Sequence, residues 1–389
     1  MSLEKRVVVK VGSGLIVNQQ DLNFRYAFLH GLLSDIADLR RENYQVVLVS
    51  SGAAAIGLGA LGMRPETAGV QDKQAAAACG QPLVMNMYKQ ISMEFGMNIA
   101  QVLLTSEEME NRRRYLNTKN TIEKLLENNI LPIVNENDTV TTEEIRVGDN
   151  DRLAAKVSQM VRAPNFVMLT DIDGLYDRPP SEPGAVFVDE VEDVSVYLDA
   201  TKSKGALGSG GMLTKMQAAN MAQNAGATAF IAKGIVERPI SSILKNERRH
   251  TRCIAIGDPE SSWRVWLTDR LQMAGSLVVS AEAAEKLVAG GRGVDAMDVV
   301  ASHGEYSKGD VLHIYDEDGV EIGRGLTNFS SKETVLLVRC PEDEVTAVLG
   351  YHSKSDLIAA DNFVVLGKHH LLWDQPTPEP MERAAQAAD

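Results

Sequence analysis

The stretch RVVVKVG, residues 6–12, is a short run of β-branched apolar residues that ends in a glycine. Hydrophobic residues at nearly every position are typical of a strand that is buried on both faces of a sheet. Five further runs of this kind follow, and each ends in Gly, Ser, Thr, Asn or Asp: 44–52, 98–105, 130–137, 165–174 and 227–234. The six runs together predict six buried strands.

Helical patterns separate these strands. Between residues 27 and 40, for example, Phe28, Leu29, Leu32 and Leu33 recur at helical spacing. Four other segments have a similar pattern: 72–94, 117–128, 151–162 and 212–225. Alternating strands and helices predict an α/β fold with a mainly parallel sheet sandwiched by helices. Ligands of such sheets bind beyond the carboxyl ends of the strands, where the polar strand endings collect.

The pattern changes after about residue 258, where short alternating strands are separated by DEDG and GRG turns. We therefore expect a first domain at 1–258, a linker at 259–272 and a small, mostly β domain at 273–355. The remaining residues, 356–389, form an extension that becomes rich in Pro, Glu and Ala, and we expect disorder near its end.

Composition narrows the possible functions. The 389 residues carry a net charge of −14, whereas general nucleic-acid binders need a basic face. The chain has no run of 18 apolar residues and no signal-peptide pattern, and its three cysteines form no CxxC pair. Its seven histidines show no metal-ligand spacing. We expect a cytoplasmic protein with reduced thiols, no membrane span and no protein-held metal.

The first candidate functional residue is Lys10, which lies inside the first apolar run and precedes Gly12-Ser13-Gly14. A buried lysine is costly unless its charge has a partner, although a lysine on an edge strand would avoid that cost. The functional alternative is a cation aimed at phosphates, with backbone N–H groups of the glycine-rich turn binding the same anion.

Two other strand endings carry candidate substrate ligands. In VSSGAAAIG, 49–57, Ser51 is followed by small residues that allow a ligand to approach the backbone closely. In VNENDTV, 134–140, four consecutive polar residues include Asn135 and Asp138. This is more polarity than a turn needs, and Asn with Asp can hold an α-ammonium and an α-carboxylate group.

The segment IRVGDNDRLAAKV, 145–157, places Asp149, Asn150 and Asp151 at the start of a helical pattern. These residue types are favoured at helix starts, so a cap and a functional site are both consistent with the segment taken alone.

Two later segments are candidates for nucleotide binding. LTDIDGLYD, 169–177, ends a strand at Thr170 and Asp171, although turn formation alone could explain these residues. GALGSGGMLTKMQAA, 205–219, is a glycine-rich loop leading into a helix that carries Lys215. Such a loop can bring N–H groups to a phosphate, and its alternative is a flexible linker.

These motifs, in this order and at these spacings, resemble the glutamate 5-kinases of the amino-acid kinase superfamily. The resemblance covers about residues 5–258, and the following domain resembles a PUA domain. It implies that Mg-ATP phosphorylates the γ-carboxylate of L-glutamate, giving L-glutamyl 5-phosphate in the first step of proline biosynthesis. ATP and Mg²⁺ are the implied cofactors, with Mg²⁺ held mostly by phosphates and water.

The resemblance also implies a role for each matching residue. Lys10 and Lys215 contact the ATP phosphates, and Asp151 holds these two lysines in place. Glutamate is bound by Ser51, Asp138 and Asn150, with Asn135 and Asp149 nearby. The residues matching the ATP-binding positions are Lys10, Thr170, Asp171, Ser209, Gly210, Gly211, Met212, Leu213, Thr214 and Lys215.

The same resemblance implies a homodimer or homotetramer, feedback inhibition by proline, and channelling of the product to a glutamyl phosphate reductase. The PUA-like part departs from the usual pattern, because GRGVDAMD, 291–298, replaces Gly-x-Ser-Leu-Leu-x-x-Gly. Residues 274–353 carry fourteen Asp and Glu against six Lys and Arg, a net charge of −8 that would repel phosphates. We expect this domain to be architectural or regulatory and not to bind RNA.

Three alternatives to the glutamate kinase reading follow from the sequence. The nearest is a related kinase that acts on aspartate, N-acetylglutamate or UMP, although no PUA-like domain is expected there. The second is an RNA-binding or RNA-modifying protein. The third, a catalytically silent amino-acid sensor, would require loss of Lys10 and Lys215, and both are present.

Overall fold

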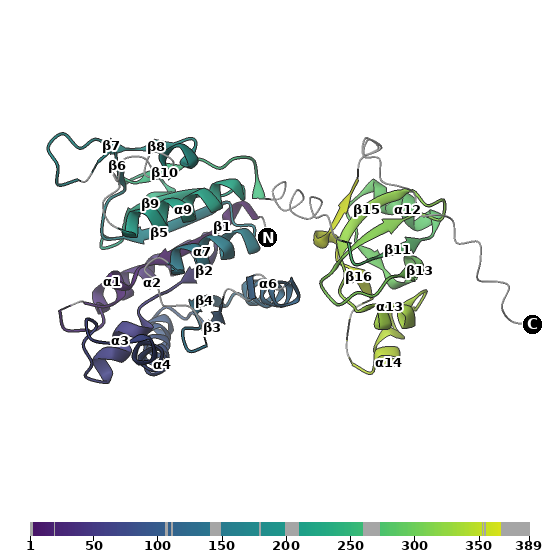
Figure 1. Cartoon of the computed structure of the whole chain (residues 1–389), viewed down its shortest axis with the longest axis horizontal. Helices are drawn as coiled ribbons and strands as arrows, with labels where there is room; N and C mark the ends of the chain where they lie inside the picture. Colours follow the sequence, from purple (N-terminus) through teal and green to yellow (C-terminus); the bar gives the residue numbers. More distant parts are fainter. Residues whose placement is uncertain are drawn as a thin grey trace, which may run out of the picture. The chain divides into compact units, whose positions relative to one another are not determined.

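The computed structural model describes residues 3–18, 20–105, 108–109, 112–140, 149–178, 180–198, 210–259, 273–351, 353 and 355–366. The chain divides into two compact units, Met1–Trp266 and Leu267–Asp389 (Figure 1). The first is an α/β unit and the second is small and mostly β, so the predicted fold class is confirmed.

The first unit is built on an eight-stranded sheet. In spatial order its strands are β3 (Ile99–Leu104), β4 (Leu131–Glu136), β2 (Gln45–Val49), β1 (Arg6–Val11), β5 (Asn165–Thr170), β9 (Thr228–Lys233), β10 (Thr251–Cys253) and β8 (Glu190–Val191). The first six are parallel and fall within the six predicted runs, while β10 is antiparallel to β9. A two-stranded hairpin, β6 (Leu175–Tyr176) with β7 (Phe187–Val188), follows β5.

The position of β1 excludes the edge-strand reading of Lys10. This strand lies between β2 and β5, and Lys10 is in register with Val49 on one side and Met168 on the other. Both neighbours are fully buried, so the lysine reaches the interior from a central strand.

Helices cover both faces of this sheet. They are α1 (Ser13–Ile16), α2 (Tyr26–Arg41), α3 (Ala53–Ala60), α4 (Val70–Glu94), α6 (Arg112–Glu127), α7 (Asp149–Met160), α9 (Gly210–Asn224) and α10 (Ser241–Leu244). Because side chains alternate along a strand, Val7 and Val9 pack into the core formed with α2 and α4. Lys10 lies on the other face of β1, against which α7 packs. In the described ranges, no helix combines the length and apolar character that crossing a bilayer requires.

Helices α3 and α4 touch through their backbones at two glycines. A Cβ atom added to Gly57 would lie 1.7 Å from the carbonyl oxygen of Ala76, and one added to Gly80 would lie 1.9 Å from that of Ala53. No side chain fits at either position, so glycine is required there for close approach. This contact fixes the position of α4 relative to the segment that follows β2.

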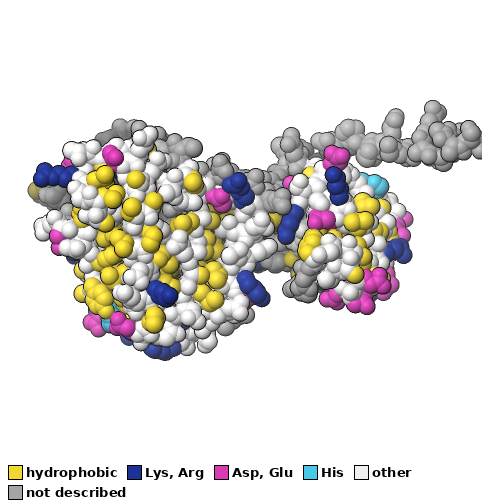
Figure 2. Space-filling view, turned by 90° about the horizontal axis from the view of Figure 1, so that it is seen from below, with side chains coloured by type: hydrophobic (Ala, Val, Ile, Leu, Met, Phe, Trp, Pro, Cys, Tyr) yellow, Lys and Arg dark blue, Asp and Glu magenta, His cyan; other side chains and the backbone are white. Residues whose placement is uncertain are grey.

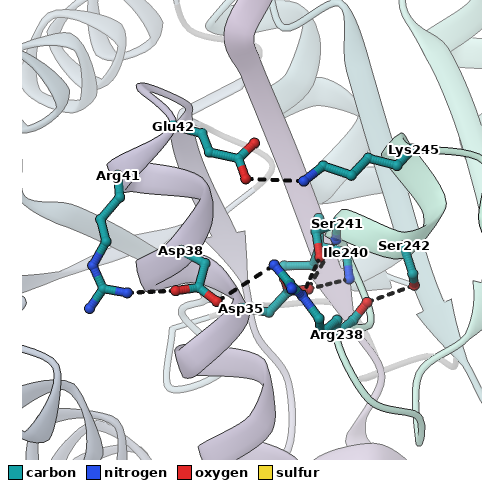
Figure 3. A network of polar contacts seen from close by, with 9 residues as sticks. All are labelled: Asp35, Asp38, Arg41, Glu42, Arg238, Ile240, Ser241, Ser242 and Lys245. Atoms are coloured by element: carbon teal, nitrogen blue, oxygen red, sulfur yellow. Dashed lines mark hydrogen bonds and ion pairs between the residues drawn. The ribbon is translucent and has the colours of Figure 1, made fainter.

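A second set of contacts ties α2 to the segment after β9 (Figure 3). The buried carboxylate of Asp35 accepts hydrogen bonds from the backbone N–H groups of Ile240, at 2.7 Å, and Ser241, at 3.0 Å. Arg238 lies beside it, with Nε 3.9 Å from Asp35 Oδ1 and Nη2 3.6 Å from Asp38 Oδ2. Asp35 thereby satisfies the free N–H groups at the start of α10.

The second unit has its own sheet and core. The sheet contains, in spatial order, β13 (Val299–His303), β11 (Gly275–Val279), β14 (Val311–Tyr315), β15 (Glu321–Leu326) and β17 (Phe363–Val365). A second pair is formed by β12 (Val294–Asp295) and β16 (Asp356–Ile358). Three helices accompany them: α12 (Ala281–Ala289), α13 (Ser331–Leu337) and α14 (Val345–Leu349). Buried side chains such as Leu277, Leu312 and Leu357 form a core within this unit.

Candidate functional site

A cavity of about 1040 Å³ lies at the carboxyl ends of β1, β2, β4 and β5. This is the edge of the sheet where ligands of parallel α/β folds bind. Nine of the residues predicted from sequence line it: Lys10, Ser51, Asn135, Asp138, Asn150, Asp151, Thr170, Asp171 and Lys215. Residues more than 200 positions apart in the sequence therefore line the same cavity.

A cluster of three charged groups, which we call the lysine cluster, occupies one part of the cavity. The carboxylate of Asp151 contacts Lys10 Nζ through Oδ1 at 2.5 Å and Lys215 Nζ through Oδ2 at 3.4 Å. Thr214 Oγ1 donates to Oδ2 at 3.0 Å. Two ammonium groups and one carboxylate leave one net positive charge in a largely buried place.

Burial and mutual attraction shift the pKa values in the lysine cluster. Burial lowers the pKa of Lys10, because removing the ammonium from water outweighs its attraction to Asp151. For Asp151, burial favours the neutral acid, but the nearby charges of Lys10 and Lys215 prevail and lower its pKa. The carboxylate therefore stays ionised between the two lysines.

The start of α9 differs in detail from the sequence prediction. The helix begins at Gly210, two residues before the predicted segment 212–225, so Gly210 and Gly211 belong to its first turn and not to the loop, while Lys215 lies in the helix as predicted. The side chains of Thr214 and Lys215 bond back to the carbonyl oxygen of Gly211, at 3.0 and 3.2 Å. These bonds, and the contacts with Asp151, stabilise the helical conformation.

A second group of polar residues, which we call the amide chain, lies beside the lysine cluster. Asn150 Nδ2 donates to Ser51 Oγ at 2.9 Å and to Asn135 Oδ1 at 3.2 Å. Asn135 Nδ2 in turn donates to Gln81 Oε1, on α4, at 2.8 Å. Asn150 Oδ1 is buried and has no partner among the described residues. The chain contains no charged group, unlike the lysine cluster.

The helix α7 carries one member of each group. It begins at Asp149, so Asn150 and Asp151 are consecutive residues of its first turn. The segment therefore starts a helix, and Asn150 and Asp151 also contact residues that are distant in the sequence.

The end of β5 supplies the predicted nucleotide-side residues. Thr170 is buried, Asp171 is exposed, and Thr170 Oγ1 donates to Asp171 Oδ1 at 2.8 Å. Across the cavity, Arg25 Nε donates to the carbonyl oxygen of Gly14 at 3.0 Å and thereby supports the glycine-containing turn after β1.

Some predicted residues do not line the cavity. Met212 is buried and Leu213 is 37% exposed, and neither is among the lining residues. Asp149 is described only as the first residue of α7, and Ser209 lies outside the described residues. Among the described residues, no group of three His, Cys, Asp or Glu side chains is arranged to hold a metal ion.

Sequence reasoning missed several residues at this site, and four of them bear on its chemistry or shape. Arg25, Lys73 and Ile235 line the cavity, and Gln81 joins the amide chain from α4. Arg25, Lys73 and Gln81 lie away from the predicted strand endings, and Ile235 directly follows the run 227–234, which carries no recognisable motif. A polar residue in a helix, such as Gln81, is most simply interpreted as facing solvent.

Comparison with known proteins identifies the family. The sequence matches the amino acid kinase family over residues 5–233 and the PUA domain over residues 275–349. It is 40% identical over 365 residues to a glutamate 5-kinase of Sphingopyxis alaskensis, covering 93% of this chain and 97% of that protein. It is 41% identical over 364 residues to a glutamate 5-kinase of Laribacter hongkongensis, covering 93% and 98%.

A carbamate kinase from Giardia lamblia bound to AMP-PNP has a similar fold, with a TM-score of 0.50 and 17% identity over 66% of this chain and 100% of that chain. The chain belongs to the amino acid kinase family and, within it, to the glutamate 5-kinases.

Proposed function

We propose that the cavity binds Mg-ATP and L-glutamate and that the chain transfers the γ-phosphoryl group to the γ-carboxylate of glutamate. The observation that carries the proposal is the adjacency of Asn150 and Asp151 on α7, which joins the amide chain to the lysine cluster. A substrate held by the first group would lie next to a phosphate held by the second.

The lysine cluster fits a polyphosphate. Its net positive charge and its burial suit a phosphoryl group, whose transfer depends on positioning and on electrostatic stabilisation. Lys10 and Lys215 would contact the phosphates, and Asp151 would hold both ammonium groups in place. Mg²⁺ bound with ATP would neutralise phosphate charge and would be held mainly by the phosphates and water.

The amide chain fits an α-amino acid. Both N–H groups of Asn150 are used internally, so its carbonyl oxygen is left to accept from an α-ammonium group. The hydroxyl proton of Ser51 is left to donate to an α-carboxylate. Asp138, which also lines the cavity, adds a negative charge that favours an ammonium group.

The reaction needs no general base. The γ-carboxylate of glutamate has an ordinary pKa of about 4.3 and is ionised at neutral pH. Its oxygen attacks the γ-phosphorus, the bond to the bridging oxygen breaks, and ADP leaves as γ-glutamyl phosphate forms. The residues of the site position the two reactants and stabilise charge. Thr170, Asp171 and the first turn of α9 would contact the nucleotide.

An ADP-release assay tests this proposal. We expect turnover that depends on L-glutamate and is absent with aspartate, N-acetylglutamate or UMP. Turnover with one of those three acceptors and none with L-glutamate would reject the proposal.

The place of the reaction in metabolism rests on the family resemblance. We propose that it is the first step of proline biosynthesis, with proline as a feedback inhibitor and transfer of the product to a glutamyl phosphate reductase. An acyl phosphate hydrolyses readily, which favours direct transfer. A proline titration of the initial rate tests the regulation, and no inhibition would remove it.

The family resemblance also suggests self-association as a homodimer or homotetramer. Figure 2 views the larger unit from the side on which α3 and α4 lie, and hydrophobic side chains gather there. Leu83 and Met93 of α4 are exposed at 42% and 68%. Light scattering of the purified chain would distinguish an oligomer from a monomer.

We propose an architectural or regulatory role for the second unit. Its net charge of −8 over 274–353 disfavours binding to a phosphate backbone. RNA filter binding at moderate salt tests this role, and RNA retention that falls with added salt would contradict it.

A further inference from the structure

We propose that Gln81 is a positioning residue for the amino-acid substrate, because it sets the orientation of the amide chain that ends at Asn150. This inference deepens the proposed function and depends on it. The residue itself is remote from the reacting atoms and acts through Asn135.

The amide-to-amide hydrogen bonds of the amide chain have the same direction. The chain runs from Asn150 Nδ2 to Asn135 Oδ1 and from Asn135 Nδ2 to Gln81 Oε1. Rotating one amide alone by 180° would bring two N–H groups or two carbonyl oxygens face to face. The members must therefore keep or reverse their orientations together.

Reversal of the whole chain would change what the substrate meets. In the observed orientation Asn150 uses both N–H groups internally and keeps its carbonyl oxygen for a donor. In the reversed orientation it would offer N–H groups, which repel an ammonium group. Only the observed orientation suits an α-amino acid.

Gln81 occupies the end of the chain away from the substrate, so its own orientation selects between the two states. It lies on α4, one residue after Gly80, where the close contact between α3 and α4 fixes the helix. Asn135 is 2% exposed and lies on β4, so water has little access to the link between them. A group at position 81 that can only accept would lock the observed state.

Two substitutions of Gln81 distinguish its role as a hydrogen-bond acceptor from its role in packing. Gln81→Glu keeps an acceptor, and an ionised carboxylate can only accept from Asn135. Gln81→Leu is of similar size and offers no hydrogen bond, so Asn135 and Asn150 become free to reverse.

Tyr88→Phe provides a matched control. Tyr88 lies on the same face of α4, two turns further on, and its hydroxyl contacts Ser50 Oγ at 3.0 Å. Its removal also deletes a buried hydrogen bond between α4 and a strand ending, but it leaves the amide chain intact.

The experiment compares L-glutamate with glutarate, which lacks the α-ammonium group, in ADP-release assays of the full chain at saturating Mg-ATP. If glutarate is not turned over, its inhibition constant against L-glutamate replaces the rate. Thermal melting and the KM for ATP are measured for each variant, so that general damage to the fold is detected.

For Gln81→Leu we expect the KM for L-glutamate to rise about tenfold, the scale of one hydrogen bond to a charged group. We expect glutarate recognition to change less than about twofold on that same scale, and the KM for ATP to stay constant. Gln81→Glu and Tyr88→Phe should keep the preference for L-glutamate over glutarate.

Equal losses for both substrates, or the same loss of preference in Tyr88→Phe, would overturn the inference. So would an unchanged preference in Gln81→Leu. Absence of L-glutamate turnover in the unmodified chain would instead reject the proposed function on which the inference depends.

Discussion

The lysine cluster and the amide chain, which both lie at the cavity, differ in the kind of interaction that they offer a ligand. The lysine cluster consists of charges, with both lysines in contact with one carboxylate. The amide chain consists of neutral groups whose hydrogen bonds have a direction. Charge attracts a phosphate from any side, whereas a directed amide distinguishes an ammonium group from a carboxylate.

This difference predicts separable effects of substitution. Changes in the lysine cluster should mainly affect the rate of phosphoryl transfer, because charge develops during that step. Changes in the amide chain should mainly affect glutamate binding. The two groups are joined by Asn150 and Asp151, consecutive residues of α7, which makes the separation measurable.

The largest effect is expected for Lys215→Ala. Loss of one of two ammonium groups should lower kcat by about a thousandfold, the scale seen for groups that stabilise a transferring phosphoryl. The fold should persist, because Asp151 keeps its ion pair with Lys10. Melting curves test whether the fold persists, and ADP release measures kcat. The control for loss of a positive charge is Lys89→Ala, at an exposed position of α4. A rate near that of the unmodified chain would contradict the role of Lys215.

The second-largest effect is expected for Asp151→Asn. The substitution leaves Lys10 buried without its counter-charge, and loss of one partner from a buried pair costs about 3 kcal/mol of stability. We expect kcat to fall about a hundredfold as the lysines lose their common anchor. Denaturant unfolding and kinetics test this together. Unchanged stability would mean that the pair contributes nothing to the folded state.

Asn150→Ala should affect binding more than rate. Without the amide, we expect the KM for L-glutamate to rise about tenfold or more while the KM for ATP stays constant. Initial rates over a matrix of both substrate concentrations separate the two constants. A parallel rise in the KM for ATP would show that the amide chain also affects ATP binding. The roles of the amide chain and the lysine cluster would then not be separable.

The smallest effect is on the pH profile. Because burial lowers the pKa of Lys10, this ammonium loses its proton at a lower pH than an ordinary lysine. As pH rises, kcat/KM for ATP should therefore fall before the ordinary lysine range is reached. In Lys10→Arg the residual activity should keep its value to higher pH, since arginine stays charged. An unchanged alkaline limb in that variant would exclude Lys10 as its origin.

The lowered pKa of Asp151 predicts how the stability of the fold changes at acid pH. A carboxylate whose pKa is lowered in the folded state stabilises the fold at pH values above the ordinary aspartate pKa. This contribution is lost as pH falls towards the lowered value. Acid unfolding of the unmodified chain and of Asp151→Asn should converge there.

Much of this arrangement could be predicted from sequence. The apolar runs located the six parallel strands, since continuous hydrophobicity is required of strands covered on both faces. Lys10 stood out because a charge inside such a run needs a partner, and its partner is Asp151. The polar residues at the ends of the predicted strands then indicated the position of the cavity.

Other features depend on packing that the sequence does not display. The role of Gln81 depends on a contact with Asn135, 54 positions away, and on how α4 is held against α3. Helical periodicity cannot indicate that this side chain faces a strand ending. The helix α9 also begins two residues earlier than predicted, at Gly210, because a glycine pair favours a loop by composition. In the structure the side chains of Thr214 and Lys215 bond to the carbonyl oxygen of Gly211 and support the added turn.

The contact of Asp35 with the start of α10 has a consequence for the order of folding. Asp35 and Ile240 are 205 positions apart, so their hydrogen bond closes most of the first unit into a loop. Contacts of such long range carry a high entropic cost and form late, after the strands between them have associated. Loss of this carboxylate should therefore accelerate unfolding much more than it slows refolding, which stopped-flow measurements on Asp35→Ala would detect.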